Sequence, residues 1–113
     1  MNKRKIGKRA EILVCKYLEK KGYEIIETNW TCYGGEIDII ALKGRFIFVE
    51  VKYVKNYECS IIDLLTKTKS RALNRSIQLY SREHGIKDWQ VDILFLKKSA
   101  DKLVLKHYKN VLI

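Results

Sequence analysis

Two β-rich segments, residues 36–42 and 46–53, flank the short sequence Lys43-Gly44-Arg45. Segments of this kind on either side of a glycine-containing turn predict a β-hairpin. Side chains alternate between the two faces of a strand, and here both faces carry large apolar residues. Strands with that pattern are covered on both sides, as happens in the middle of a sheet and not at its edge. The hairpin therefore requires a sheet-based fold in which these two strands are central.

Apolar residues also recur at helical spacing in two other parts of the chain. Steps of three and four residues predict one helix over residues 6–21 and another over residues 63–84, each followed by a glycine that stops it. Ser60 and Asp63 fit a capping box at the start of the second helix. The apolar stripes are Ile6, Ala10, Leu13, Val14, Tyr17 and Leu18 in the first helix, and Leu65, Ala72, Leu73, Ser76, Ile77 and Tyr80 in the second.

Three further strands are expected over residues 23–27, 89–96 and 102–108, with a loop over residues 29–35. The element order is then α-β-β-β-α-β-β, which predicts an α/β fold with a mixed β-sheet flanked by helices. The chain contains no proline and no low-complexity tract or internal repeat that would mark a linker. We therefore expect a single domain over residues 1–113, a common domain size.

The charge of the chain points to a polyanionic partner. Basic side chains outnumber acidic ones by 23 to 13, which gives a net charge of +10. Ribosomal, membrane-surface and merely basic proteins share such an excess, but nucleic acid is the leading partner because cations neutralise its phosphates and release counterions. No apolar segment is long enough to cross a bilayer or to form the core of a signal peptide, so we expect a cytoplasmic protein without a membrane partner. Zinc-ligand spacing is absent among the cysteines and histidines, which are Cys15, Cys32, Cys59, His84 and His107.

Charged residues interrupt the apolar hairpin at one end. If the turn is centred on Gly44, the numbers of paired residues sum to 88, and Asp38 lies opposite Glu50. Lys52 then lies opposite Glu36, on the same face as the two acids. Two opposed carboxylates lose hydration and repel each other, so the pair requires a proton, a positive side chain or a cation. Lys52 can supply part of that charge, and a hard divalent cation the rest.

Two interpretations of this cluster are open from the pattern alone. It is either a metal site or a salt-bridged patch where the hairpin leaves the core, with Lys52 neutralising both acids. A shift of register by one residue would place Asp38 and Glu50 on opposite faces and remove the metal interpretation. The register of the hairpin is therefore the feature to test first.

The same two segments resemble a known family. Residues 35–41, GEIDIIA, and residues 48–52, FVEVK, are similar to the GEIDLIA…FVEVK signature of the YraN-like bacterial proteins. That family belongs to the PD-(D/E)XK nuclease superfamily and is related to Holliday junction resolvases. Weaker matches extend over most of the chain. The departures from the family pattern are Ala10 in place of a glycine, Tyr53-Val54 in place of Thr-Arg, and Gln90-Val91 in place of Arg-Phe.

The resemblance implies a restriction-endonuclease-like core that holds a magnesium or manganese ion. It implies that Asp38 and Glu50 are metal ligands, together with the backbone carbonyl of Val51. Lys52 is implied as the catalytic lysine that positions the attacking water or stabilises developing charge. Glu11 resembles the superfamily's glutamate on the first helix, which orients a metal-bound water.

Further basic residues are candidates for the same site. Lys69 lies near the centre of the apolar stripe of the second helix, and because lysine is rarely buried alone, it should either extend outward to solvent or reach an acid. We favour the second, with Glu50 or Asp38 as the acid and Lys69 as part of the catalytic machinery. The basic residues at the N-terminus lead into the helix that carries Glu11, so we expect them to contact nucleic-acid phosphates. They are Lys3, Arg4, Lys5, Lys8 and Arg9.

These features together predict a divalent-metal-dependent endonuclease that hydrolyses DNA phosphodiester bonds on branched or single-stranded substrates. The alternative is a non-catalytic nucleic-acid-binding protein that keeps the nuclease fold. The intact Asp, Glu and Lys set favours the enzyme, because binding alone has no need of opposed carboxylates that repel phosphate. A junction resolvase would in addition require a homodimer with two symmetric sites. For Trp30 and Tyr33, stacking on bases and anchoring of the core are both open. The role of Asp92 is open too, although the core-like neighbours Trp89 and Ile93 favour a structural one.

Overall fold

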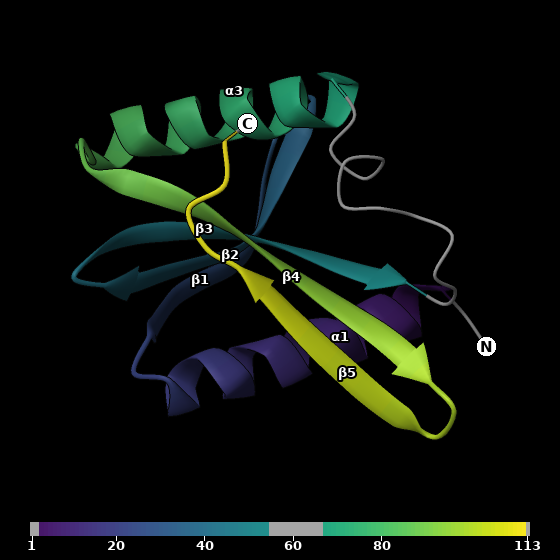
Figure 1. Ribbon diagram of the computed structural model, residues 1–113. Helices are drawn as coiled ribbons and strands as arrows, with labels where there is room; N and C mark the ends of the chain where they lie inside the picture. Colours follow the sequence, from purple (N-terminus) through teal and green to yellow (C-terminus); the bar gives the residue numbers. More distant parts are fainter. Residues whose placement is uncertain (1–2, 55–66, 113) are drawn as a thin grey trace.

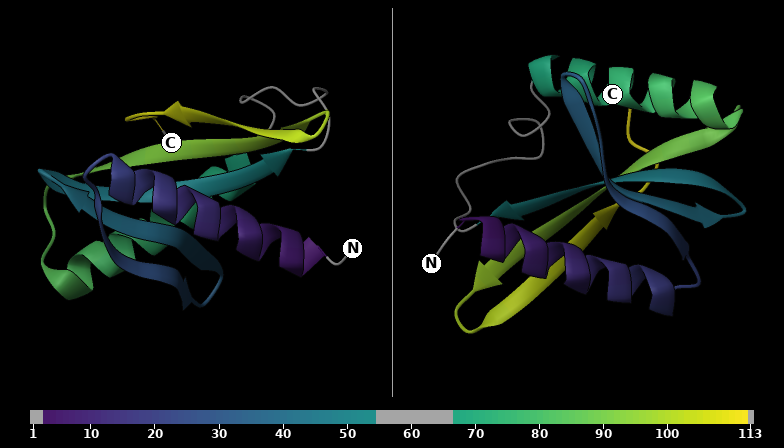
Figure 2. Two further views of the ribbon diagram at one scale, coloured as in Figure 1. Left: turned by 90° about the horizontal axis from the view of Figure 1, so that it is seen from below. Right: turned by 180° about the vertical axis from the view of Figure 1, so that it is seen from behind.

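The sheet of this protein has five strands in the order β1-β2-β3-β4-β5, of which only β3 and β4 pair in parallel. The computed structural model describes residues 3–54 and 67–112, so the start of the second predicted helix, with Ser60 and Asp63, lies outside the described residues. Figures 1 and 2 show α1 and α3 on opposite faces of the sheet. The predicted α/β fold, with its mixed sheet and its order of elements, is confirmed. The elements are α1 (Lys3–Lys20), β1 (Glu24–Cys32), β2 (Gly35–Lys43), β3 (Arg45–Val54), α3 (Lys67–His84), β4 (Trp89–Ser99) and β5 (Lys102–Tyr108).

The predicted central hairpin is formed by β2 and β3. Ile39 pairs with Val49 and Lys43 pairs with Arg45, so the predicted register, with residue numbers that sum to 88, is confirmed. Gly44 alone connects the two strands and has a φ of 74°, in the left-handed region that glycine adopts at little cost. β3 lies in the middle of the sheet, between β2 and β4.

Each face of the sheet buries its apolar side chains against one helix. Ile39, Ala41, Ile47 and Val49 pack in a cluster with α1, whereas Ile40 and Phe48 pack in a second cluster with α3. Most of the predicted helical stripes are confirmed, since their buried residues are Ala10, Val14, Leu18, Leu73, Ser76, Ile77 and Tyr80, whereas the side chains of Ile6 and Leu65 lie outside those described. The assignment of Leu13 to the core is wrong: it is 41% exposed, because it lines a cleft beside the sheet.

Both helices end at the glycines that the sequence indicates. The N–H of the residue after each glycine donates to a carbonyl five residues back, from Tyr23 to Leu18 at 2.9 Å and from Ile86 to Ser81 at 2.8 Å. This bond is the one that closes a helix ended by a left-handed glycine. The first helix begins at Lys3, three residues before its predicted start. No helix in the described ranges is long and apolar enough to cross a membrane.

The predicted loop over residues 29–35 is wrong. β1 continues to Cys32, which pairs with Gly35 across a tight turn at Tyr33 and Gly34. β1 is an edge strand, and most of its side chains are exposed. Its sequence therefore lacks the alternation of apolar and polar residues by which a half-buried strand is recognised.

Candidate functional site

The candidate site lies where β2 separates from β3. The last backbone pair between these strands is Ile39 with Val49, so the predicted pairings of Asp38 with Glu50 and of Glu36 with Lys52 are wrong. Beyond this pair β2 stays with β1, whereas β3 stays with β4. Figure 1 shows the β1–β2 ribbon turning toward α3 while β3 runs on across the sheet. The separation opens a gap whose sides are the two strands that carry the acids.

Asn29 lies at the bend of the β1–β2 ribbon. Its φ is 53°, in the left-handed region that asparagine tolerates better than most residues. The pairs between β1 and β2 pass from Thr28 with Ile39 to Trp30 with Ile37. Ile37 packs in the cluster with α3, whereas Ile39 packs in the cluster with α1. The prediction that these two isoleucines share a face is therefore wrong, because the strand turns about its axis at the bend.

A cavity of about 150 Å³ lies in the gap between the strands. It collects the acidic residues of three elements, which are α1 and the two strands of the hairpin. The predicted motif residues thus meet in one place, although the strands that carry them are no longer paired there. The residues that line the cavity are Ala10 and Glu11 from α1, Glu36 and Asp38 from β2, and Glu50, Val51, Lys52 and Tyr53 from β3.

Asp38 is the most buried acid of the cavity, with 8% of its surface exposed. Its Oδ2 accepts a hydrogen bond of 2.8 Å from the backbone N–H of Val51, which ties the side chain of β2 to the backbone of β3. Burial, together with the negative charge of Glu50, raises the pKa of Asp38 to about 7, although the hydrogen bond from Val51 opposes the rise. The charges of Glu11 and Glu36 raise it further. At neutral pH this carboxyl group is poised between its neutral and its ionised form.

Lys52 and Glu50 form an ion pair inside the cavity. The Lys52 Nζ lies 3.0 Å from the Glu50 Oε1, and less than a fifth of each side chain is exposed. This contact agrees with the expectation that the lysine neutralises part of the acidic charge. Glu50 nevertheless still raises the pKa of Asp38, so the lysine does not cancel the repulsion between the two acids.

Glu11 reaches the cavity from α1. Burial raises the pKa of Glu11, as do the charges of Glu36 and Glu50, whereas a hydrogen bond from the Asn29 side chain lowers it. The same asparagine that bends the ribbon therefore also holds the helix glutamate. Glu11 itself is half-buried.

The donor groups of the cavity fit a hard cation. Within residues 3–54 and 67–112, no three side chains of His, Cys, Asp or Glu form a ready-made ligand cluster. Magnesium, however, commonly binds through one or two carboxylates and keeps several waters. Asp38, Glu50 and the carbonyl of Val51 offer only oxygen donors, which suits magnesium or manganese and not zinc.

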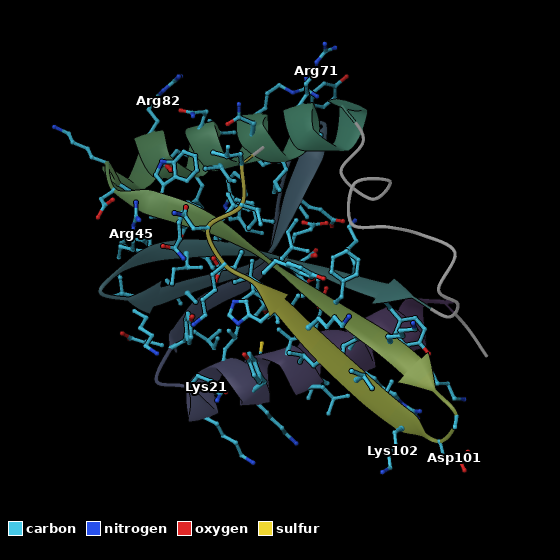
Figure 3. All side chains as sticks on the ribbon, viewed as in Figure 1. Lys21, Arg45, Arg71, Arg82, Asp101 and Lys102 are labelled. Atoms are coloured by element: carbon cyan, nitrogen blue, oxygen red, sulfur yellow. The ribbon has the colours of Figure 1, made fainter. Side chains whose placement is uncertain are left out.

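The other predicted site residues lie outside the cavity or outside the described side chains. Lys8 and Arg9 are exposed on α1, next to the cavity residues Ala10 and Glu11. The backbones of Lys3, Arg4, Lys5 and Lys69 lie in the two helices, but their side chains are not among those described, so their predicted contacts stay predictions. Arg71 and Arg82 point from α3 away from the sheet in Figure 3.

Trp30 and Tyr33, the two aromatic residues whose roles the sequence left open, differ clearly in burial. Trp30 is half-buried and meets the Tyr80 ring edge-on, with 5.2 Å between centroids, so it is an anchor of the core. Tyr33 is fully exposed at the turn between β1 and β2. Sequence reasoning missed Asn29 and Tyr53 as neighbours of the site. The only signal for Asn29 in the sequence was its residue type. Asparagine tolerates a positive φ, and this one lies in the segment that was predicted to be a loop.

Asp92 is structural, the role that its core-like neighbours favour. It is fully buried and accepts hydrogen bonds from the Gln90 side chain at 2.8 Å and from the Asn110 N–H at 2.9 Å. Its second oxygen lies 2.7 Å from His107 Nε2, and the other ring nitrogen of His107 lies 3.0 Å from the Tyr17 hydroxyl. These contacts join β4, β5 and α1 away from the carboxylate cavity.

Fold and site together define a class of small α/β protein, in which a mixed five-stranded sheet splits to hold a cavity of carboxylates and one lysine. The family model described as "Uncharacterised protein family UPF0102" matches residues 10–96, and the chain belongs to this family. That membership confirms the resemblance seen in the motif. The match includes Glu11, Asp38, Glu50 and Lys52.

Several UPF0102 proteins are similar to this chain over most of its length. A UPF0102 protein of Carboxydothermus hydrogenoformans is 34% identical over 99% of this chain and 98% of its own length. One from Caldanaerobacter subterraneus subsp. tengcongensis is 33% identical over 99% of this chain and 95% of its own. A Campylobacter jejuni relative is 38% identical over 80% of this chain and 82% of its own.

Proposed function

We propose that this protein is a divalent-metal-dependent endonuclease that hydrolyses DNA phosphodiester bonds. The observation that carries the proposal is the unfavourable carboxylate pair: Asp38 is buried beside Glu50, and its pKa is raised to about 7 even though the N–H of Val51 donates to it. A buried carboxyl group that is costly to ionise, and that lies beside a second acid and a lysine, is typical of a functional site. A bound cation would remove the repulsion and recover the lost free energy.

The cavity residues would divide the work between metal binding and charge stabilisation. Asp38, Glu50 and the carbonyl of Val51 would hold magnesium or manganese, which when bound polarises the scissile phosphate and lowers the pKa of a water. Lys52, held by Glu50 at 3.0 Å, places a positive charge beside the cavity, where negative charge develops on the phosphate. Glu11, whose pKa is raised, supplies a carboxylate that can accept a proton from the attacking water.

The positive charge of the chain supports a nucleic-acid substrate. A net charge of +10 draws phosphates to the surface, and the exposed Lys8 and Arg9 lie directly beside two residues of the cavity. A protein that only binds nucleic acid would gain affinity by losing the acids of the cavity. The cluster therefore favours cleavage over binding alone, and we expect the protein to act on DNA in the cytoplasm.

The test is a cleavage assay with linear, flapped and four-way DNA in the presence of magnesium or manganese. We expect metal-dependent cleavage of at least one substrate by the wild type, reduced by at least about 100-fold in Asp38→Asn and in Lys52→Ala. Glu83→Gln and Lys87→Ala, at exposed positions away from the cavity, are matched controls and should cleave normally.

Absence of any metal-dependent difference between wild type and variants on all three substrates would refute the nuclease proposal. Metal binding without cleavage would favour the non-catalytic alternative. Paired cuts on four-way DNA by a dimer would identify a junction resolvase.

A further inference from the structure

A second cleft adjoins the carboxylate cavity. It has a volume of about 280 Å³ and lies between α1, the end of β3 and the hairpin of β4 and β5. Ala10 and Tyr53 line both this cleft and the cavity. A ligand in the cleft would therefore lie next to the cavity that Glu50 and Lys52 line.

The inner wall of this cleft is apolar, and part of that wall is open to solvent. Leu96 and Ala10 form its buried base and are only 2% and 3% exposed. Leu13 and Leu103 line its sides, and they are 41% and 49% exposed, so both offer apolar surface to a ligand in the cleft. Tyr53 adds an aromatic ring on the side nearest the acids.

The rim of the cleft is positively charged. The charged residues that line the cleft are three cations and one acid. The cations are Arg9 from α1 and Lys98 and Lys102 from the β4–β5 hairpin, and the acid is Asp101. Figure 3 shows Asp101 and Lys102 together at the tip of that hairpin. Apolar walls within a cationic rim match a ligand that has a flat apolar face and flanking negative charges, which describes a nucleotide within a strand.

We infer that this cleft seats one unpaired base of a single-stranded nucleic acid, with the flanking phosphates on Arg9, Lys98 and Lys102. The inference deepens the proposed nuclease function, on which it rests, because it names the substrate as single-stranded beside the site of cleavage. In a duplex the faces of the bases are stacked on their neighbours, so only an unpaired base can present its face to Leu13 and Leu103. The cleft is slightly smaller than the roughly 300 Å³ at which small-molecule pockets begin, which suits a single base.

The test measures binding by fluorescence anisotropy in EDTA, so that no cleavage occurs. The probes are oligothymidylate of about 20 nucleotides, an abasic oligomer of the same length and charge, and a duplex. We expect the wild type to bind oligothymidylate at least about 5-fold more tightly than the abasic oligomer, because stacking of a base contributes affinity that phosphates alone do not. This comparison requires no variant and therefore no assumption about folding.

The decisive variant is the double substitution Leu13→Ala/Leu103→Ala. It should lower affinity for oligothymidylate by about 5-fold or more and leave affinity for the abasic oligomer unchanged. The matched control is Ile12→Ala/Val104→Ala, at the neighbouring positions of α1 and β5, which are 50% and 40% exposed but do not line the cleft. This control should bind all three probes as the wild type does.

The phosphate contacts are tested separately. Lys102→Ala should weaken binding of oligothymidylate and of the abasic oligomer alike, and should reduce the slope of log affinity against log salt by about one. Lys20→Ala, about 16 Å along α1 from Arg9, is the charge-matched control and should change single-strand affinity less than twofold.

Equal affinity of the wild type for oligothymidylate and the abasic oligomer would overturn the inference, as would tighter binding of the duplex or equal effects of the two double substitutions. Because these measurements contain no metal, failure of the nuclease proposal and failure of this inference are distinguishable. Loss of cleavage activity with base-dependent binding intact would refute only the nuclease.

Discussion

At the scale of single residues, Asp38 shows how the site opposes stability. Burial and the charge of Glu50 raise the pKa of Asp38 to about 7 in the folded protein, far above the value near 3.8 of a free aspartate. Between these two values the folded state holds a proton that the unfolded state has lost, so stability falls as pH rises from about 4 to about 7. Above pH 7 the folded protein carries the full cost of the ionised pair.

We therefore predict that Asp38→Asn stabilises the metal-free protein at pH 8, by on the order of 3 kcal/mol. Asparagine keeps an oxygen that can accept the hydrogen bond from the Val51 N–H, and it carries no charge. Urea unfolding in EDTA at several pH values measures the effect, which should shrink as the pH falls toward 4. A variant less stable than the wild type at pH 8 would show that the carboxylate pair is not repulsive.

Gly35 is the first residue of the motif, and it must be a glycine for a steric reason that the sequence alone does not reveal. A Cβ at this position would collide with the Ser76 Oγ and approach the carbonyl of Ala72 to 3.1 Å, because α3 packs directly on the start of β2. We predict that Gly35→Ala lowers the free energy of unfolding by about 1–3 kcal/mol. Ser76→Ala in the same chain should restore part of the loss, since it removes the hydroxyl, and the double-mutant cycle measures that coupling. Additive effects of the two substitutions would contradict the predicted contact.

At the scale of elements, the sequence predicts the helices and strands whose apolar residues recur at a regular spacing and whose ends are marked by glycines. The register of β2 and β3 follows from Gly44 and from apolar residues on both faces, and the ends of α1 and α3 follow from their glycines. The path of β1 could not be predicted, because an exposed edge strand carries little apolar alternation. The acids were correctly brought together, but no periodicity reveals that β2 separates from β3 beyond Ile39 and Val49, or that Asn29 adopts a positive φ.

Asn29 should therefore be sensitive to the shape of its substitute. We predict that Asn29→Val lowers the free energy of unfolding by about 1–2 kcal/mol, because a β-branched residue disfavours the φ of 53° observed there. Asn29→Gly accepts this φ and should keep the fold, while it removes the hydrogen bond that lowers the pKa of Glu11. Chemical unfolding compares the two variants with the wild type. Equal stability of the valine and glycine variants would mean that the bend is not a required feature.

At the scale of the whole molecule, a buried polar network joins β4, β5 and α1 through residues that do not line the carboxylate cavity. Asp92 links β4 to β5 through His107 and to the following chain through the Asn110 N–H, and His107 in turn meets Tyr17 of α1. The network therefore fixes the position of α1 relative to the sheet, and through α1 the position of Glu11.

We predict that Asp92→Ala lowers the free energy of unfolding by about 3 kcal/mol or more, because it leaves the buried His107 and two hydrogen-bond donors without their acceptor. Asp88→Ala, which removes an ion pair with Arg45 at the surface, is the control and should cost less than about 1 kcal/mol. Thermal unfolding of both variants provides the comparison. A stable Asp92→Ala protein that had lost only metal binding would contradict the structural role.

The central claim is that the opposed carboxylates of Asp38 and Glu50 form a cation site, and it is tested most directly by counting bound manganese at pH 8. The account predicts one Mn²⁺ per wild-type chain, binding weakened by at least about 100-fold in Asp38→Asn, and unchanged binding in Glu83→Gln. A wild type that binds no manganese, or an Asp38→Asn variant that binds it as tightly as the wild type, would contradict the claim.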